Sequence, residues 1–421
     1  MIAPLLACAV AAGDSPSYET RLKTESVVLQ AAEVHTGDGA VYKPGVVILL
    51  DGKVVAAGPA PPVPAGSRVI DCGSGVLTPG LVDAACQLGT FQRFGYAEGG
   101  SEVIPQLDAA DAIDFYSKEF EQLAREGVTT VYVTGEAASV ISCKGAAVKT
   151  AGPIAERRLA ARPCVKGTLG PECSGRGAFN FPPNRFGPPT ILQRRPTTRM
   201  GSAWVFRKAF LDALAAKDGK LGVDAEEEPA ALAALQDVLK GATALRMQAR
   251  EALDIRSAAR LCDEFGLQFT LEYAVEVGRC LDLVTARKIP VIFGPVRLED
   301  STATGFEDGT PAWETPKRLA ESGVAFCLTA CDGLGDGGLA RQTGMAIRHG
   351  LEPARALRAV TADAAALLGL EKQVGRIAEG LDADLVLWNG APFDDASRPV
   401  LVLVRGRPVL DLDHRFGKEN S

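Results

Sequence analysis

The stretch from residue 244 to residue 328 contains four short apolar runs: Ala244-Leu-Arg-Met-Gln248, Leu267-Gln-Phe-Thr-Leu-Glu-Tyr273, Ile289-Pro-Val-Ile-Phe293 and Val324-Ala-Phe-Cys-Leu328. Amphipathic segments that we predict to be helices separate these runs, over residues 251–264, 275–287 and 315–322. The runs recur every 22 to 35 residues, a spacing typical of parallel strands that alternate with helices. This half of the chain is therefore predicted to be an α/β structure built on a parallel sheet.

The same alternation extends toward the N-terminus. Residues 76–83 and 128–134 have the pattern of two further strands, and residues 117–126 have that of a helix. Six strands are placed in this way, and two more are expected between residues 136 and 243. With right-handed crossovers and this many units, a (β/α)8 TIM-like barrel over residues 76–374 is favoured over an open sheet.

One segment of this predicted barrel has no regular period. Residues 151–200 are rich in proline, glycine and arginine, so we predict an irregular lid over one face of the barrel. Its arginines could attract an anionic ligand, or the segment could simply be an irregular loop in solvent.

Both ends of the chain show short strands and turn signals instead. Val46-Val-Ile-Leu-Leu50 and Lys53-Val-Val-Ala-Ala57 flank Asp51-Gly52, which is the pattern of a β-hairpin with a two-residue turn. A similar pattern recurs around Asn389-Gly390. We predict that residues 26–75 and 375–412 combine into one small β-sandwich, a composite domain. Residues 1–25 are expected to be a signal-like or flexible N-terminus, and residues 413–421 a tail.

Composition excludes several kinds of partner. The 45 basic and 52 acidic residues give a net charge of −7, so nucleic acid is not expected as a partner. We find no apolar stretch long enough to span a membrane. Residues 1–13 are apolar and small, and Leu5-Leu-Ala-Cys8 looks like a lipobox, so an exported, periplasmic location in a bacterial cell is favoured over the cytoplasm. The sequence leaves open cleavage or lipidation of the N-terminus and a disulfide between Cys164 and Cys173.

Several motifs carry a resemblance to a known family. They are Leu77-Thr-Pro-Gly-Leu-Val-Asp83, Thr361-Ala-Asp-Ala-Ala-Ala-Leu-Leu-Gly369, Val374-Gly-Arg-Ile377, Gly380-Leu-Asp-Ala-Asp-Leu-Val-Leu-Trp388 and Val402-Leu-Val-Arg-Gly-Arg407. With these motifs the chain resembles the amidohydrolase superfamily, particularly its imidazolonepropionase-like branch, over roughly residues 26–411. The resemblance implies a barrel beside a small β-sandwich, and hydrolysis of non-peptide carbon–nitrogen bonds with zinc or another divalent metal.

The positions that hold the metal in that family are altered here. Where the family has His-x-His on its first barrel strand, this chain has Ala85-Cys86-Gln87. Where the family's fifth and sixth strands carry histidines, the chain has Gln248 with Arg250 and Glu272 with Tyr273. Asp332 lies near the position of the family's catalytic aspartate and is the one candidate catalytic residue.

The histidine count points the same way. The chain has three histidines, His35, His349 and His414, and they are never spaced as ligands. One carboxylate cannot complete the four-ligand shell of zinc, and the charge of Arg250 repels a cation. We therefore predict no metal site and no cofactor.

If the family geometry holds, the altered positions line the C-terminal mouth of the barrel: Gln87, Gln248, Arg250, Tyr273 and Asp332. A guanidinium at this mouth could take the place of the metal, paired with Asp332 or Glu272. One interpretation is a pocket in which Arg250 and the amides bind a small carboxylate or phosphate. The other is a plugged core in which these groups satisfy one another.

Two classes of function follow. The first is a degenerate family member, a pseudoenzyme, that binds a small anionic ligand or supports an active paralogue or a second copy of itself as a partner subunit. The second is an active amidohydrolase that acts on a cyclic amide or similar small molecule through an atypical mononuclear or metal-free site. The low histidine count favours the first class.

Overall fold

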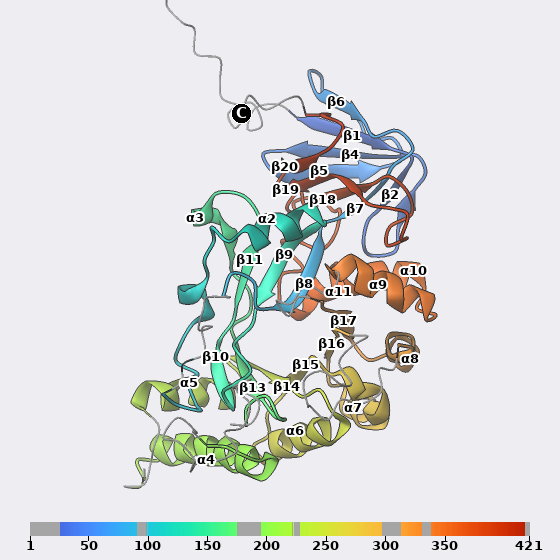
Figure 1. The fold of residues 1–421 in the computed structure, drawn as a ribbon. Helices are drawn as coiled ribbons and strands as arrows, with labels where there is room; N and C mark the ends of the chain where they lie inside the picture. Colours follow the sequence, from blue (N-terminus) through green and yellow to red (C-terminus); the bar gives the residue numbers. More distant parts are fainter. Residues whose placement is uncertain are drawn as a thin grey trace, which may run out of the picture.

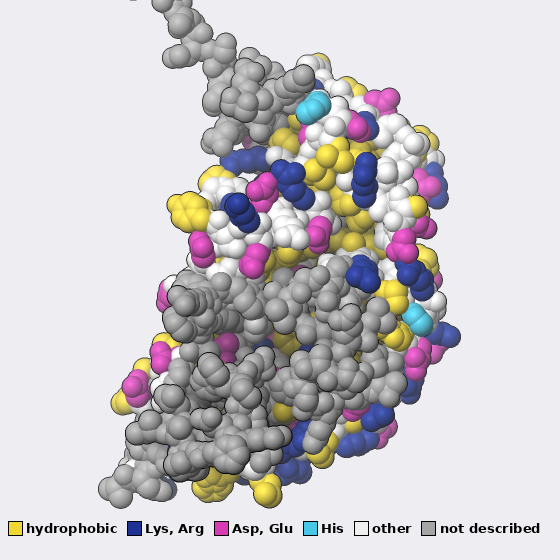
Figure 2. All heavy atoms as spheres, viewed as in Figure 1, with side chains coloured by type: hydrophobic (Ala, Val, Ile, Leu, Met, Phe, Trp, Pro, Cys, Tyr) yellow, Lys and Arg dark blue, Asp and Glu magenta, His cyan; other side chains and the backbone are white. Residues whose placement is uncertain are grey.

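The computed structural model describes residues 26–90, 98, 100–174, 195–220, 222, 228–296, 313–330 and 338–416. Figure 1 shows a group of β-strands drawn from both ends of the chain, and below it a larger α/β part with its helices on the outside. None of the helices in the described ranges is long and apolar enough to cross a bilayer. Acidic and basic side chains are interspersed over the described surface in Figure 2.

The α/β part contains two sheets. The larger has the strand order β10 (Ile141–Lys144), β13 (Cys164–Thr168), β14 (Ala244–Gln248), β15 (Phe269–Glu272), β16 (Val291–Phe293) and β17 (Phe326–Leu328). From β13 to β17 all pairs are parallel, as the repeat of apolar runs predicts. The smaller sheet has the order β12 (Arg158–Leu159), β11 (Ala146–Lys149), β9 (Val128–Val133) and β8 (Leu81–Cys86).

Helices connect these strands on the outside. They are η1 (Ala109–Ala112), α2 (Lys118–Arg125), α3 (Ile154–Arg157), α4 (Arg199–Lys217), α5 (Pro229–Leu239), α6 (Ala252–Glu264), η2 (Val275–Cys280), α7 (Leu281–Arg287), α8 (Thr315–Ser322), α9 (Gly338–Arg348), α10 (Pro353–Ala359) and α11 (Ala362–Leu367). Local sequence signals determine where several helices begin. The side chain of Thr198 caps α4 by accepting a hydrogen bond from Gly201 N, and a proline is the first residue of α5 and of α10.

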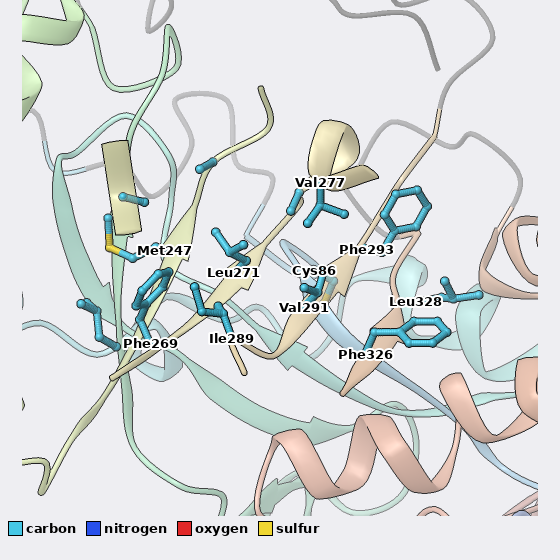
Figure 3. Packing of buried hydrophobic residues seen from close by; sticks show 14 of the residues in the cluster. Cys86, Met247, Phe269, Leu271, Val277, Ile289, Val291, Phe293, Phe326 and Leu328 are labelled. Carbon is cyan, nitrogen blue, oxygen red and sulfur yellow. The ribbon is translucent and has the colours of Figure 1, made fainter. Parts of the chain in front are cut away.

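Alternate residues of the parallel strands face the helices and form the main core. Met247, Leu271, Val291 and Phe326 belong to this core together with Ile255 of α6. Figure 3 shows the core side chains side by side along β14 to β17. Because successive side chains alternate between the faces of a strand, the residues between them, such as Arg246 and Glu272, lie on the opposite face, which we call the inner face.

The first and last strands of the α/β part, β8 and β17, meet through side chains. Thr329, directly after β17, donates to Asp83 and to the carbonyl oxygen of Ala85, and Ala330 N donates to Asp83 Oδ2 at 3.1 Å. In a closed barrel, β8 and β17 would be joined by backbone hydrogen bonds. Within the described ranges, the side-chain contacts of Thr329 and Asp83 join them instead. The observed fold is therefore mixed α/β with two sheets, and closure into a (β/α)8 barrel stays a prediction.

Strands from both ends of the chain share the remaining two sheets. One has the order β5 (Lys53–Gly58), β4 (Gly45–Leu50), β1 (Val27–Ala31) and β6 (Arg68–Asp71). The other has the order β20 (Arg407–Asp411), β19 (Pro399–Val404), β18 (Leu385–Trp388), β7 (Val76–Pro79), β2 (Glu33–His35) and β3 (Val41–Tyr42). Leu29, Leu77 and Leu385 share one core, and Trp388 Nε1 donates to Thr78 Oγ1 at 3.0 Å. Asp51 and Gly52 both have positive φ in the predicted hairpin turn between β4 and β5.

Residues 76–83, predicted as one strand, form two strands in different sheets. Strand β7 ends at Pro79 and pairs with β18, whereas β8 begins at Leu81 and pairs with β9. Gly80 lies between them, and a Cβ atom there would sit 2.2 Å from Thr129 Oγ1. The chain passes from one sheet to the other at this point because glycine lets the backbone approach Thr129 closely.

The predicted irregular lid at 151–200 is partly wrong. It contains α3, β12, the parallel strand β13 and the start of α4, while residues 175–194 lie outside the described ranges. Two barrel strands are expected from the sequence between 136 and 243; the described residues there form β10, β11, β12 and β13, of which β13 alone has a parallel neighbouring strand, β14. Cys164 and Cys173 are buried free thiols, so the structure has no disulfide between them. Cys173 Sγ instead lies 3.3 Å from Ser202 Oγ.

Candidate functional site

Charged and polar side chains gather on the inner face where three parallel strands end. Thr168, Gln248 and Glu272 are the last residues of β13, β14 and β15, and they are partners in register across the sheet. Lys166 and Arg246 stand two residues earlier on β13 and β14 and are also partners in register. The side chains on each strand share a face because they are two residues apart. We call these five residues the strand-end cluster.

Glu272 is the centre of this cluster. Its Oε1 lies 3.0 Å from Lys166 Nζ, and its Oε2 lies 2.8 Å from Arg246 Nε. Thr134, directly after β9, donates to both carboxylate oxygens at 2.9 and 3.2 Å. The three charged residues are buried, with exposed fractions of 1% for Lys166, 3% for Arg246 and 0% for Glu272. Two buried cations therefore share one carboxylate.

Two tyrosine rings flank the cations. Arg246 Cζ lies 4.3 Å from the ring centroid of Tyr132, and Lys166 Nζ lies 5.1 Å from that of Tyr273. Both distances fall within the range of cation–π attraction. Arg246 Nη2 also donates to the carbonyl oxygen of Ala84 on β8. The rings and this carbonyl hold the guanidinium and the ammonium in place without adding negative charge.

The ion pairs control the protonation of Glu272. Burial by itself would raise the pKa of this carboxyl, but Lys166 and Arg246 outweigh burial, and the pKa lies below its ordinary value. Burial would likewise lower the pKa of Arg246, yet Glu272 reverses this and the pKa is raised. Glu272 is therefore ionised and Arg246 protonated at neutral pH.

The structure brings together three of the residues predicted from the sequence, namely Gln248, Glu272 and Tyr273. Gln87 lies half-buried directly after β8, where its carbonyl oxygen accepts from Thr90. Asp332 lies outside the described residues.

Of the two partners predicted for Arg250, Glu272 pairs with Arg246 instead, and Asp332 lies outside the described residues. Strand β14 ends at Gln248, and Arg250 Nε lies 3.9 Å from Glu172 Oε1. Burial raises the pKa of Glu172, and Arg250 opposes that rise. The guanidinium that reaches Glu272 is that of Arg246, because the inner-face positions of β14 are 246 and 248 and not 250.

Sequence reasoning missed Lys166 and Arg246. Arg246 could have been found, because it stands two residues before Gln248 on the same strand face. Lys166 had no such signal, since β13 lies within a segment predicted to be irregular.

Within the described ranges, the side chains at the strand ends do not form a set that fits the family's divalent metal. All three histidines are among the described residues and lie elsewhere: His35 on β2 beside Glu33, His349 after α9 against Trp313, and His414 after β20. Across the described ranges, no three His, Cys, Asp or Glu side chains form a possible metal cluster. The inner face instead presents Lys166 and Arg246, whose charges oppose a cation.

Comparisons with known proteins agree with the fold. An amidohydrolase from Thermotoga maritima MSB8 is 28% identical with a TM-score of 0.77, covering 91% of this chain and 100% of that one. A Xaa-Pro dipeptidase with bound methionine (16% identity, TM-score 0.58, 91% and 99% covered) and a molinate hydrolase (16%, 0.57, 94% and 98%) share the fold.

The sequence comparisons cover a smaller part of the chain than the structural ones. A family model described as "Amidohydrolase family" matches residues 307–409, and no curated protein matches the chain significantly. Together with the solved structures, this match supports the resemblance to the amidohydrolase superfamily. The chain is similar to that superfamily in sequence over residues 307–409 and in fold over 91% of its length.

Proposed function

We propose that this chain is a superfamily member that has lost metal-dependent hydrolysis and acts as a ligand-binding subunit. The observation that carries the proposal is the strand-end cluster, in which Lys166 and Arg246 converge on Glu272 at 3.0 and 2.8 Å. Metal-dependent hydrolysis requires a cation that lowers the pKa of bound water. Two fixed positive charges beside the only carboxylate of the cluster disfavour such a cation.

Ligand binding is favoured over a merely plugged core by the balance of charge. A core whose buried charged groups neutralise one another needs one anion for each cation, because an unpaired buried charge costs free energy. The strand-end cluster has two cations and one anion. An anionic ligand would restore the balance, which supports binding as the role of this end of the sheet.

Hydrolysis assays test the proposal against the alternative of an active enzyme. The untagged full chain would be incubated with Zn²⁺, Mn²⁺ or Co²⁺ and assayed on a panel of cyclic amides, beside the variant Asp332→Asn. We expect no metal-dependent turnover in either protein. Turnover that requires metal and disappears in Asp332→Asn would contradict the proposal and establish the active-hydrolase alternative.

A further inference from the structure

Five buried polar atoms of the strand-end cluster have no hydrogen-bond partner within the described ranges, and two of them, Lys166 Nζ and Arg246 Nε, form the ion pairs with Glu272. The other three are Arg246 Nη1, Thr168 Oγ1 and Gln248 Oε1. Their residues are 3%, 0% and 4% exposed. Buried polar atoms in folded proteins are almost always paired with protein or with a bound molecule. Three such atoms on adjacent strands of one face therefore point to a common occupant.

The other contacts of Arg246 show that Nη1 is left for that occupant. Nε lies 2.8 Å from Glu272 Oε2, and Nη2 donates to the carbonyl oxygen of Ala84. Lys166 Nζ carries three protons and contacts one carboxylate oxygen at 3.0 Å. Both cations thus retain donor capacity.

Two other carboxyl groups of the described residues each have one oxygen in contact with another residue and one buried oxygen without a hydrogen-bond partner. Glu136 is buried and accepts from Ala138 N, and Glu172 pairs with Arg250. Among the described carboxylates, Glu272 forms the ion pairs with Lys166 and Arg246, and Glu172 acts on Lys166 at longer range.

Resting on the proposed ligand-binding function, we infer that Lys166, Arg246, Thr168 and Gln248 form a binding site for a small oxyanion that carries a neighbouring hydroxyl or amine. The ammonium, guanidinium and threonine hydroxyl donate to a carboxylate or phosphate, and hydrogen bonds from charged donors are the stronger kind. Gln248 Oε1 accepts from the hydroxyl or amine. Glu272 is the positioning residue that holds both cations at the strand ends.

Isothermal titration of the untagged full chain at low ionic strength tests this site. The probes are acetate, glycolate and inorganic phosphate, so that a carboxylate, a carboxylate with a hydroxyl, and a phosphate are compared. We expect glycolate to bind more tightly than acetate because only glycolate offers a donor to Gln248. Binding of phosphate but of neither carboxylate identifies a phosphate ligand for the same donors.

A pair of threonine variants gives the test its control. Thr168→Val removes the unpartnered hydroxyl of the site with almost no change of volume, so the variant is expected to fold. It should weaken binding of the best probe about tenfold, the scale of one hydrogen bond to a charged group. Thr130→Val removes another buried hydroxyl without a hydrogen-bond partner in the described chain, on β9 and away from the strand ends, and should leave binding unchanged.

Two results overturn the inference: no binding of any probe to the wild type, or equal binding by the wild type and Thr168→Val. Neither result decides the proposed function, which fails separately if metal-loaded protein hydrolyses cyclic amides. The two failures are therefore distinguishable on one protein preparation.

Discussion

Arg246 Nε lies 2.8 Å from Glu272 Oε2, and both side chains are buried on the inner face of the parallel sheet. The two residues stand on adjacent parallel strands, β14 and β15, and Lys166 reaches the same carboxylate from β13. In a superfamily whose members typically bind a divalent metal, the described strand ends of this chain hold a fixed guanidinium and a fixed ammonium. The following predictions depend on that arrangement and on the packing around it.

Replacing Glu272 with glutamine should strongly destabilise the fold. The variant leaves Lys166 and Arg246 buried without their anion, and breaking a buried ion pair costs about 3–5 kcal/mol. Urea unfolding measures the loss. Glu264→Gln is a matched control, because Glu264 also lies between two cations, Arg207 and Arg260, but is 35% exposed. That control should lose less than about 1 kcal/mol, and equal losses in the two variants would contradict the account.

Stability should fall as the pH is lowered from 7 toward 4. The pKa of Glu272 lies below its ordinary value of 4.5 in the folded state, so the unfolded chain takes up a proton first as the pH falls. The contribution of Glu272 is thus complete above its unfolded pKa and is lost as the pH passes down through its folded pKa. Asp382, whose pKa is also lowered, adds a loss of the same sign.

The contribution of Glu272 to this pH dependence can be measured by comparing the wild type with a variant that lacks the carboxylate. The free energy of unfolding of the wild type and of Glu272→Gln would be followed from pH 7 to pH 4. The difference in free energy of unfolding between the two proteins should become smaller as the pH falls, because protonation of Glu272 removes the same charge as the substitution. If this difference in free energy of unfolding stays constant between pH 7 and pH 4, Glu272 is not ionised in the folded protein.

A second buried ion network joins the two parts of the molecule. Lys149 of β11 pairs with Asp384, which directly precedes β18, and at 3.1 Å with Asp382, which stands two residues earlier. Lys149 is 1% exposed, so Lys149→Met should cost about 3–5 kcal/mol by leaving the buried carboxylate of Asp384 without its cation. Lys53 also contacts Asp382 but is 49% exposed, and Lys53→Met should cost about 1 kcal/mol or less. Thermal unfolding of the two variants compares these losses, and the reverse order of stability would be inconsistent with the network.

Gly80→Ala tests the passage between the two sheets. An alanine Cβ would meet Thr129 Oγ1 at 2.2 Å, and a forced contact of this kind costs about 1–3 kcal/mol. Gly58, at the end of β5, has Pro61 Cδ at 4.0 Å as its nearest contact, so Gly58→Ala should be close to neutral. Denaturant midpoints of the two variants give the comparison. A neutral Gly80→Ala would mean that Thr129 moves freely at this point.

The sequence predicts most of the fold because its signals are local. The Asp51-Gly52 turn, the apolar runs at 244–248 and 324–328 and the helix at 315–322 each depend on a few adjacent residues, and each is confirmed. The run at 76–83 misleads because every residue in it is buried, so apolarity does not reveal the change of sheet at Gly80. What decides that change is Thr129, a residue distant in sequence.

The strand-end cluster is less predictable for a related reason. Gln248 and Glu272 follow from where their strands end, but the partner of Glu272 depends on which residues face inward. Arg250 stands two positions beyond Gln248 and would face inward only if β14 were longer than it is. Lys166 belongs to a strand whose neighbours are prolines and glycines, so its place in the sheet is set by pairing with β14 and not by a local pattern.

The most direct test of the central claim is the metal content of the protein. The full chain would be purified without a histidine tag or chelator and analysed by inductively coupled plasma mass spectrometry for zinc, manganese, iron, cobalt and nickel. Because the described strand ends present two cations where a metal would need neutral or anionic ligands, we predict less than about a tenth of an equivalent of these metals in total. Near-stoichiometric metal would contradict the account and would direct attention to Asp332 and the cysteines as ligands.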